Sequence, residues 1–261
     1  MPSLPQLSRR AWTVSVAAVG VVLALLVASV VSVPYVALTP GPTLNTLGES
    51  GRHPLIQIAG HRTYPTNGHL NLVTVSFIGG PGSHFNIFAA LRAWLSPHEA
   101  VVPQEEIFAP GQSQKQANQQ DTEQMVNSQQ NAVAAALCQQ KINFTTTDTV
   151  AATVKGMPAA GHLQPGDVIT AVDGTPVTCD ADASVLIKRH RPGTSIGLTI
   201  RRKGVVHQVR LTTASISGQA AVGVNVAESF RFPFSVKINI SNIGGPSAGL
   251  MFALGIIDKL T

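Results

Sequence analysis

Residues 154–177, VKGMPAAGHLQPGDVITAVDGTPV, contain the turn signals that decide the fold of the middle of this chain. Gly166-Asp167 predicts a tight turn into a strand, and Asp173-Gly174 predicts a second turn, because Gly and Asp accept the backbone conformations that hairpins need. Short apolar strands and glycine turns continue from Val150 to Thr212. This rhythm is typical of a compact, β-rich module.

The residues that follow keep a regular order. A helix over about Ala181 to His190 precedes Pro192-Gly193, and strands are expected at Ser195–Arg201 and Val205–Leu211. With the quoted stretch, this order resembles the PDZ domains of bacterial envelope proteases, and the expected domain covers residues 141–213. The resemblance implies capture of an extended peptide as an added strand beside a helix.

The same resemblance implies which residues line the peptide groove: Val150, Ala151, Val154 and Leu186. PDZ domains of this kind often receive a terminal carboxylate in a Gly-Leu-Gly-Phe-like loop. Ahead of Val150 the chain has Asn143 to Asp148, NFTTTD, in its place. The groove is therefore expected, whereas its ligand stays open.

The N-terminus contains a long apolar run. Ala11 to Val33 is 23 residues without a charge, preceded by Arg9-Arg10, and is long enough to cross a bilayer. The positive-inside rule predicts a cell-membrane protein with residues 1–10 cytoplasmic and everything after Pro34 on the far side. A cleaved signal peptide is the alternative, because Val27-Ala28-Ser29 offers small residues, but the length of the run favours an uncleaved anchor.

Composition limits the classes of function. The 261 residues are 44% hydrophobic and only 12% charged, with a net charge of +5. Seven Lys/Arg and no acid lie between Lys188 and Arg210, which predicts a solvated face near anionic headgroups, with attraction of acidic peptide segments as the alternative. Without interleaved aromatic residues, nucleic-acid binding is not expected. The chain has no GxxxxGK[ST], HExxH or paired-cysteine motif, so neither ATP use, a metal site nor another cofactor is predicted.

Two cysteines, Cys138 and Cys179, would lie in an oxidising compartment if the chain crosses the membrane. No spacing rule fixes the distance between them, so one disulfide and two buried free thiols both stay open.

Residues 34–140 separate the apolar run from the β-rich module. Pro34–Pro42 predicts an extended exit, Leu55–Ile58 and His69–Ile78 predict strands, and Phe85–Leu95 predicts a helix. We assign 34–110 to the start of an ectodomain. Residues 111–140 are rich in Gln and Asn and read either as a linker or as the wet face of a helix, with Met125–Gln140 predicted to be helical.

The final stretch, ISNIGGPSAGLMFALGIIDKLT (240–261), follows a predicted strand at Val236–Ile240. Gly244 and Gly245 allow unusual backbone conformations, Pro246 suits the first helical turn, and Ser247 then falls where free backbone N–H groups favour negative charge. Ser247 is therefore a candidate nucleophile. An ordinary helix start is the structural alternative.

Gly245-Pro246-Ser247-Ala248-Gly249 is similar to the nucleophile motif of the Lon-type serine peptidases. Together with the apolar anchor and the β-rich module, it resembles the membrane-anchored Lon-like proteases with a PDZ domain of Gram-positive and actinobacterial lineages. That resemblance implies that Ser247 is catalytic and that the neighbouring backbone supports an oxyanion at Gly244, Gly245, Pro246 and Ala248.

The fold class expected from this resemblance is α+β, with one transmembrane helix and a PDZ domain that is inserted in or precedes a partial Lon-like α/β domain. Strands around Leu70–Phe77 and Val236–Ile240 would share that domain, and residues 214–261 would begin its catalytic part. Homo-oligomers are a further family expectation.

A serine hydroxyl needs a base, and Lon-like enzymes use a lysine. Lys259 lies 12 residues after Ser247, about 18 Å along a helix, and cannot reach it. The resemblance therefore implies a lysine beyond Thr261, an ATP-independent endopeptidase that acts on peptides or on unfolded or membrane proteins, and an inactive 261-residue chain. The alternatives are a non-catalytic, membrane-tethered PDZ adaptor and a structural anchor that binds no peptide.

Overall fold

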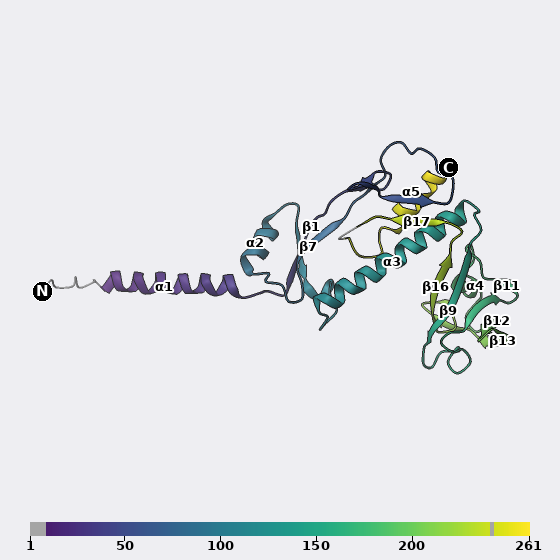
Figure 1. The fold of residues 1–261 in the computed structure, drawn as a ribbon. Coiled ribbons are helices and arrows are strands. Elements are labelled where there is room, and N and C mark those ends of the chain that lie inside the picture. The colour runs from purple at the N-terminus through teal and green to yellow at the C-terminus, as the bar shows by residue number, and fades with distance from the viewer. Residues whose placement is uncertain (1–8, 241–242) are drawn as a thin grey trace. The chain divides into compact units, whose positions relative to one another are not determined.

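The computed structural model describes residues 9–240 and 243–261 (Figure 1). Its first element is α1 (Arg9–Val30), a helix with no buried residue that is long and apolar enough to cross a membrane; a signal sequence near an N-terminus meets the same criteria. The predicted span at 11–33 is thus helical as far as Val30. The predicted cytoplasmic segment 1–10 lies outside the described residues except for Arg9 and Arg10.

The described residues form two compact units. The first draws on residues within 1–45, 71–125 and 241–246, and the second on 46–70, 126–240 and 247–261.

The first unit is built on a three-stranded antiparallel sheet. β1 (Tyr35–Pro40) lies between β7 (Val75–Gly79) and β8 (Ala100–Pro103). Successive side chains of a strand point to opposite faces, so Val36 packs on Phe108 and Ala117, whereas Ala37 packs on Phe85 and α2 (Ile87–Leu95). The helix expected at Phe85–Leu95 is confirmed, beginning at Ile87.

Most of the Gln-rich segment 111–140 forms a helix. After a 3-10 turn, η1 (Gln104–Glu106), the chain forms α3 (Gln114–Gln139). Ser113 and Gln116 make a capping box, in which Gln116 Oε1 accepts from Ser113 N at 2.9 Å and Ser113 Oγ accepts from Gln116 N at 3.3 Å. Side-chain bonds four residues apart, such as Gln114 to Asn118, then stabilise the polar face.

The second unit contains a six-stranded sheet with the order β13-β12-β10-β9-β16, and β11 pairs with β10. The strands are β9 (Thr145–Thr153), β10 (Val168–Val172), β11 (Thr175–Pro176), β12 (Ser195–Arg202), β13 (Val205–Thr212) and β16 (Val224–Arg231). α4 (Ala183–Lys188) packs on a core that includes Val150, Ile169 and Leu198. The helix at 181–190 and the strands at 195–201 and 205–211 are therefore confirmed.

The turns predicted from the quoted stretch are also confirmed. Asp173 and Gly174 both have positive φ, 45° and 76°, and join β10 to β11 with Val172 opposite Thr175. Positive φ at both central residues is the type I′ hairpin geometry that Asp-Gly favours.

The sheet contains one strand that the sequence did not place there. β16 pairs with β9 over the whole of its length, from Val224 opposite Thr153 to Arg231 opposite Thr145. The predicted domain boundary at Thr213 therefore excludes a strand of the sheet. Part of the segment 214–261, which was expected to begin a separate catalytic domain, belongs to this sheet instead.

Short elements complete the second unit. β14 (Ala214–Ile216) pairs with β15 (Gln219–Ala221), β3 (Glu49–Ser50) with β4 (His53–Pro54), and β5 (Ile56–Ala59) with β17 (Ser235–Ile238). α5 (Gly249–Leu260) packs by Gly255 against Ile56, where a Cβ would lie 2.7 Å from Ile56 Cδ1. The glycine allows the close approach of helix and strand.

The strand expected at His69–Ile78 is not continuous. The run His69–Ile78 is divided into β6 (Asn71–Leu72), which pairs with β2 (Leu44–Asn45), and β7, which pairs with β1. β17 pairs with β5 instead. Leu70–Phe77 and Val236–Ile240 therefore do not contribute to one common sheet.

Candidate functional site

A buried ion pair fixes the loop that leads into β10. Asp167 Oδ1 accepts from Arg202 Nε at 2.7 Å, and Oδ2 accepts from Arg202 Nη2 at 2.6 Å and from Gln164 N at 2.8 Å. The side chain of Asp167 is 1% exposed. These hydrogen bonds, chiefly those from Arg202, lower the pKa of Asp167 below its usual range despite burial. Arg202 thus has a structural role and is not part of a free basic surface.

Two aspartates hold α4 in place. Asp182 is its N-cap, because Oδ1 accepts from Val185 N at 2.7 Å, and Asp148 Oδ2 on β9 accepts from Ala183 N at 2.9 Å. Ala183, Leu186 and Ile187 face the core. The helix therefore sits on one face of the sheet in a fixed position.

β16 is one of the two terminal strands of the sheet, and β13 is the other. β16 pairs with β9 on one side and, within the part of the chain that the structure describes, with no strand on the other. Val224 and Val226 pack against the core that also holds Leu186 of α4. Glu228 and Phe230 of β16 line a pocket together with Asp182, the N-cap of α4, so the free edge of β16 and the start of α4 border the candidate site.

The start of β16 is anchored by a glycine. Gly223 has φ of +77°, and a Cβ there would overlap the side chain of Met157. Val154 N donates to Gly223 O and Ala159 N to Val222 O, both at 2.8 Å. The segment Ala221 to Val224 has the small-apolar-glycine-apolar order that was sought ahead of Val150, and it precedes β16 and not β9.

A pocket of about 160 Å³ lies between β16, the N-terminal end of α4 and the second half of α3. The acidic side chains Asp182 and Glu228 and the ring of Phe230 contribute to it. Its remaining lining residues are Asn131, Ala134, Ala135, Thr146, Thr178 and Cys179. The pocket therefore combines two carboxyl groups with apolar and aromatic walls.

The carboxyl groups of this pocket repel each other. Burial raises the pKa of Glu228 above its ordinary value, and Asp148 and Asp182 raise it further. Burial likewise raises the pKa of Asp148, opposed by the hydrogen bond from Ala183 and supported by Asp182. Asp148 lies opposite Glu228 in the β9–β16 ladder, and its buried Oδ1 accepts no hydrogen bond from any described residue. This end of the site therefore favours a positively charged ligand group, which would reduce the repulsion between the carboxyl groups.

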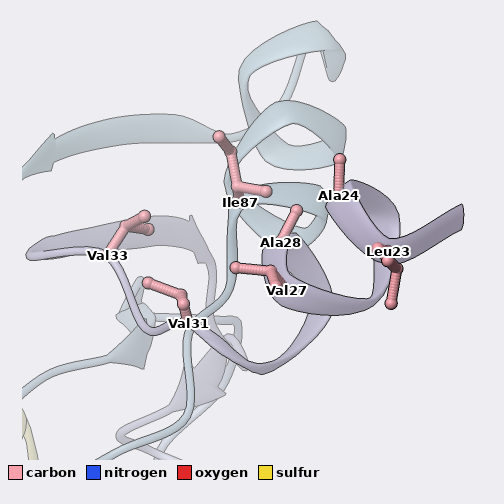
Figure 2. A pocket seen from close by; sticks show the side chains of 7 residues that line it. All are labelled: Leu23, Ala24, Val27, Ala28, Val31, Val33 and Ile87. Atoms are coloured by element: carbon pink, nitrogen blue, oxygen red, sulfur yellow. The ribbon is translucent and has the colours of Figure 1, made fainter. Parts of the chain in front are cut away.

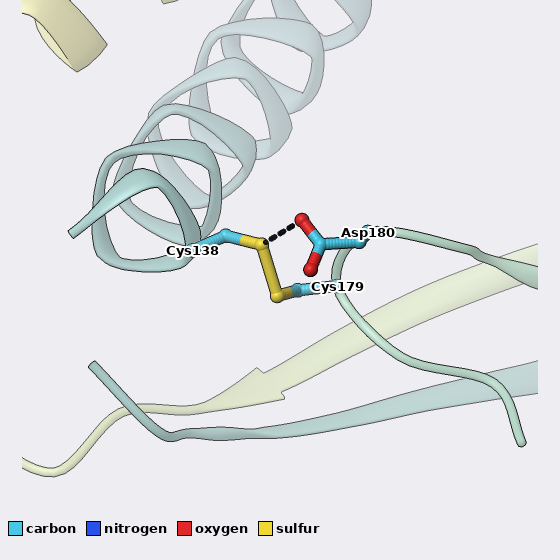
Figure 3. Close-up of side chains that lie close together, drawn as sticks. All are labelled: Cys138, Cys179 and Asp180. Atoms are coloured by element: carbon cyan, nitrogen blue, oxygen red, sulfur yellow. Dashed lines mark hydrogen bonds between the residues drawn. A yellow bond between two sulfur atoms is a disulfide. The ribbon is translucent and has the colours of Figure 1, made fainter. Parts of the chain in front are cut away.

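A disulfide borders the pocket. Cys138 of α3 and Cys179, just ahead of α4, are bonded (Figure 3), with their Cα atoms 6.0 Å apart. Of the two possibilities that the sequence left open, the structure thus has the disulfide. Asp180 Oδ1 lies 3.0 Å from Cys138 Sγ. Cys138, Cys179 and Asp180 gather like metal ligands, but the disulfide removes both thiolates that a metal would need.

Comparison with known proteins agrees with this geometry. A family model described as the PDZ domain matches residues 124–213. The chain contains a PDZ domain. The match begins within α3, so it extends further toward the N-terminus than the predicted start at 141.

Solved structures similar to the chain include two PDZ domains from Listeria SdrC-like proteins. The L. monocytogenes domain shares 21% identity, covers 30% of this chain and 85% of its own, and has a TM-score of 0.27. The L. innocua domain shares 21% identity over 31% and 92%, with a TM-score of 0.28. GtR34C of Geobacillus thermodenitrificans shares 27% identity over 30% and 94%, with a TM-score of 0.26. No curated protein matches the chain.

The residues expected to line the groove lie in two different environments. Val150 and Leu186 are buried in the core of the PDZ domain, at 0% and 4% exposure. Ala151 belongs to β9, which pairs with β16 along its length and with β10 at Asp148 and Thr149; Val154 follows β9 and is exposed. The free edge beside the pocket belongs to β16, and the glycine ahead of Val224 is the sequence signal that could have identified this strand.

The turn before α5 is as glycine-dependent as its sequence indicated. Gly245 has φ of +86° and donates to Asp121 O at 3.2 Å, and a Cβ on Gly244 would lie 2.6 Å from Asp121 Cβ. Pro246 precedes the helix instead of starting it, and Asn242 of the same motif lies outside the described residues.

Ser247 is exposed and comes before the N-cap of α5, Ala248, which is buried. Lys259 lies in the last turn of the same continuous helix, so the helix holds it away from Ser247. Within the described residues, no hydrogen bond joins Ser247 to a lysine, histidine or carboxylate. Among the described residues, Ser247 is therefore exposed and has no hydrogen-bonded base that would activate its hydroxyl.

Proposed function

We propose that the PDZ domain binds an extended peptide as an additional strand along the free edge of β16, beside α4. The observation that carries this proposal is the unpaired edge of β16 beside a pocket: an unpaired strand edge offers a row of backbone donors and acceptors, and β16 lines the pocket, whereas β13, the other terminal strand, does not. α4, fixed by its caps and core contacts, supplies the second wall.

The pocket at the end of β16 supports a preference in the ligand. Glu228 and Asp182 lie where charge repulsion and burial disfavour their ionised forms. A Lys or Arg side chain of the peptide would relieve that repulsion, place its stem along the alanines of α3 and contact the Phe230 ring. We therefore expect bound peptides to carry a basic residue at the position that reaches this pocket.

Affinity selection on the full-length protein in nanodiscs tests the proposal. Random heptapeptide libraries, one with free and one with amidated C-termini, are passed over the immobilised protein. Peptides with a basic residue are expected to be enriched, and the free-carboxylate library is expected to dominate if the Gly223 loop receives a terminus. Enrichment of no peptide above the level of empty nanodiscs would overturn the proposal.

A matched control separates strand addition from side-chain recognition. Each selected peptide is also made with N-methyl groups on alternate residues, which keeps the side chains but removes backbone donors. Strand addition requires these donors, so binding is expected to be lost in at least one of the two alternating patterns. Equal affinity of both methylated forms would show that the peptide binds in another way.

We also propose, as a second candidate function, a serine peptidase in which Ser247 is the nucleophile. The resemblance of Gly245 to Gly249 to the Lon-type motif supports it, as does the exposure of Ser247 ahead of an apolar helix. The proposal requires a lysine outside residues 1–261. Replacing Ser247 by Ala in the protein isolated from its native membrane should abolish cleavage of a fluorogenic casein substrate, and undiminished cleavage would refute it.

A further inference from the structure

The helix α2 exposes its large apolar side chains and buries its small ones, which is the opposite of the usual arrangement in a surface helix. Its five largest apolar residues are exposed, from 42% to 75%: Ile87, Phe88, Leu91, Trp94 and Leu95. Its alanines face the protein instead. Ala93 is buried, and Ala89 and Ala90 pack on the cluster of Ala37 and Phe85.

The exposed residues form a single stripe. At 100° per residue, positions 87, 88, 91, 94 and 95 cover an arc of about 120°, which is the width of the apolar face that a globular helix normally buries. Arg92 falls near one border of that arc, and the alanines lie on the opposite side. A continuous apolar stripe of this size on a surface marks an interaction site.

The position of α2 indicates what covers the stripe. Its N-cap, Asn86, accepts from Ala89 N and donates from Nδ2 to Ser29 O in the last turn of α1 at 2.9 Å. Val33 N also donates to Phe85 O at 2.8 Å. The two helices are thus joined where the apolar α1 ends, so a bilayer that contains α1 has its surface at the level where α2 begins.

An apolar cavity of about 450 Å³ continues from one helix to the other (Figure 2). Its lining comes from the last turns of α1, from two valines that follow α1, and from the first residue of α2. These residues are Leu23, Ala24, Val27, Ala28, Val31, Val33 and Ile87. The apolar surface therefore passes from α1 to α2 without a polar break, as expected where acyl chains pack against both.

We propose that α2 is an interfacial helix that lies in the surface of the bilayer entered by α1, with the stripe 87–95 among the upper acyl chains. Trp94 suits this depth, because its ring is apolar and its N–H can reach headgroups. Arg92, near the border of the stripe, can extend toward lipid phosphates. A second copy of the chain or another protein would need a complementary surface, whereas a bilayer that contains α1 would itself place lipid beside the stripe.

Tryptophan quenching by brominated lipid tests this placement. The chain has two tryptophans, Trp12 and Trp94, so W12F leaves Trp94 as the single emitter. The full-length variant is reconstituted in phosphatidylcholine and phosphatidylglycerol vesicles with or without bromines near the upper acyl carbons. A loss of Trp94 emission in the brominated vesicles is expected.

The control moves the emitter to the PDZ domain. W12F/W94F/V206W places a single tryptophan at an exposed apolar position of β13. Stronger quenching of Trp94 than of this control supports the proposal. Quenching of Trp94 that is equal or weaker overturns it, and an unquenched, blue-shifted Trp94 in a protein that cross-links as a dimer would assign the stripe to a second copy.

Discussion

Two short helices, α4 and α2, differ in which of their side chains they bury against a sheet. α4 places Leu186 and Ile187 in the core of the PDZ domain and leaves Ser184 and Lys188 in water. α2 places alanines against its sheet and leaves Leu91 and Trp94 outside. The helix of the PDZ domain thus buries its large apolar side chains, whereas α2 exposes its own, as the proposed contact of α2 with lipid requires.

The largest expected effect concerns the disulfide that ties α3 to the segment before α4. Cys138 and Cys179 close a loop with a separation of 41 residues, for which chain entropy predicts about 4 kcal/mol of stabilisation. C138A/C179A should lower the opening free energy of amides in β10 and β12 by about that amount, measured by hydrogen exchange. Amides of β1, near α2, should be unaffected. An equal loss of opening free energy in β1 and in β10 and β12 would contradict the separate stabilisation of the two regions.

Truncating one leucine in each helix tests the contrast directly. Leu186→Ala removes a buried side chain and should cost about 3 kcal/mol in the stability of the PDZ domain. Leu91→Ala, the matched change in α2, removes a side chain that is 48% exposed and should change stability in detergent by less than about 0.5 kcal/mol. A large loss from Leu91→Ala would mean that the stripe packs on protein.

The cap of α4 gives a smaller effect. Asp182→Ala removes the acceptor of Val185 N and should cost about 1 kcal/mol. Ser184→Ala, on the exposed side of the same helix, is the control and should be neutral. Urea-dependent hydrogen exchange of the α4 amides separates the two, and equal stability of both variants would contradict the assigned cap.

The smallest effect is a pH dependence at the pocket. The folded pKa of Glu228 lies above its ordinary value of 4.5, so the folded state holds its proton more tightly and the stability from this group declines as pH rises from 4.5 through the raised value. Glu228→Gln should therefore stabilise the domain at pH 7, by about 0.5 kcal/mol or less because the site is partly solvated. The gain should vanish below pH 4.

Local signals explain what the sequence could predict. The turns at Gly166 and Asp173-Gly174 depend on neighbouring residues only, so the order of strands from Val168 to Thr212 followed from the sequence. β16 could not be assigned in the same way, because its partner β9 lies some 80 residues earlier in the chain. The pairing of Cys138 with Cys179 is non-local too.

The apolar stripe of α2 shows a different limit. Its period predicted a helix at Phe85–Leu95, but the same period serves a helix buried in protein and one buried in lipid. Only the contacts of Ala37 with Ala93 showed which face turns inward. In the Gln-rich segment, Ser113 followed three residues later by Gln116 is a capping-box signature that predicts the start of a helix. The high Gln and Asn content suggested a linker instead. At Ser247 the sequence predicted the glycine turn correctly, and the function of the serine stays a proposal.

Hydrogen exchange of β16 during peptide binding tests the central claim most directly. The full-length protein in nanodiscs is compared with and without a saturating library-selected peptide. Strand addition predicts slower exchange within Val224–Arg231, because the free-edge amides gain partners, with little change in β13 at the opposite end of the sheet. Bound peptide with unchanged exchange in β16 would contradict the account.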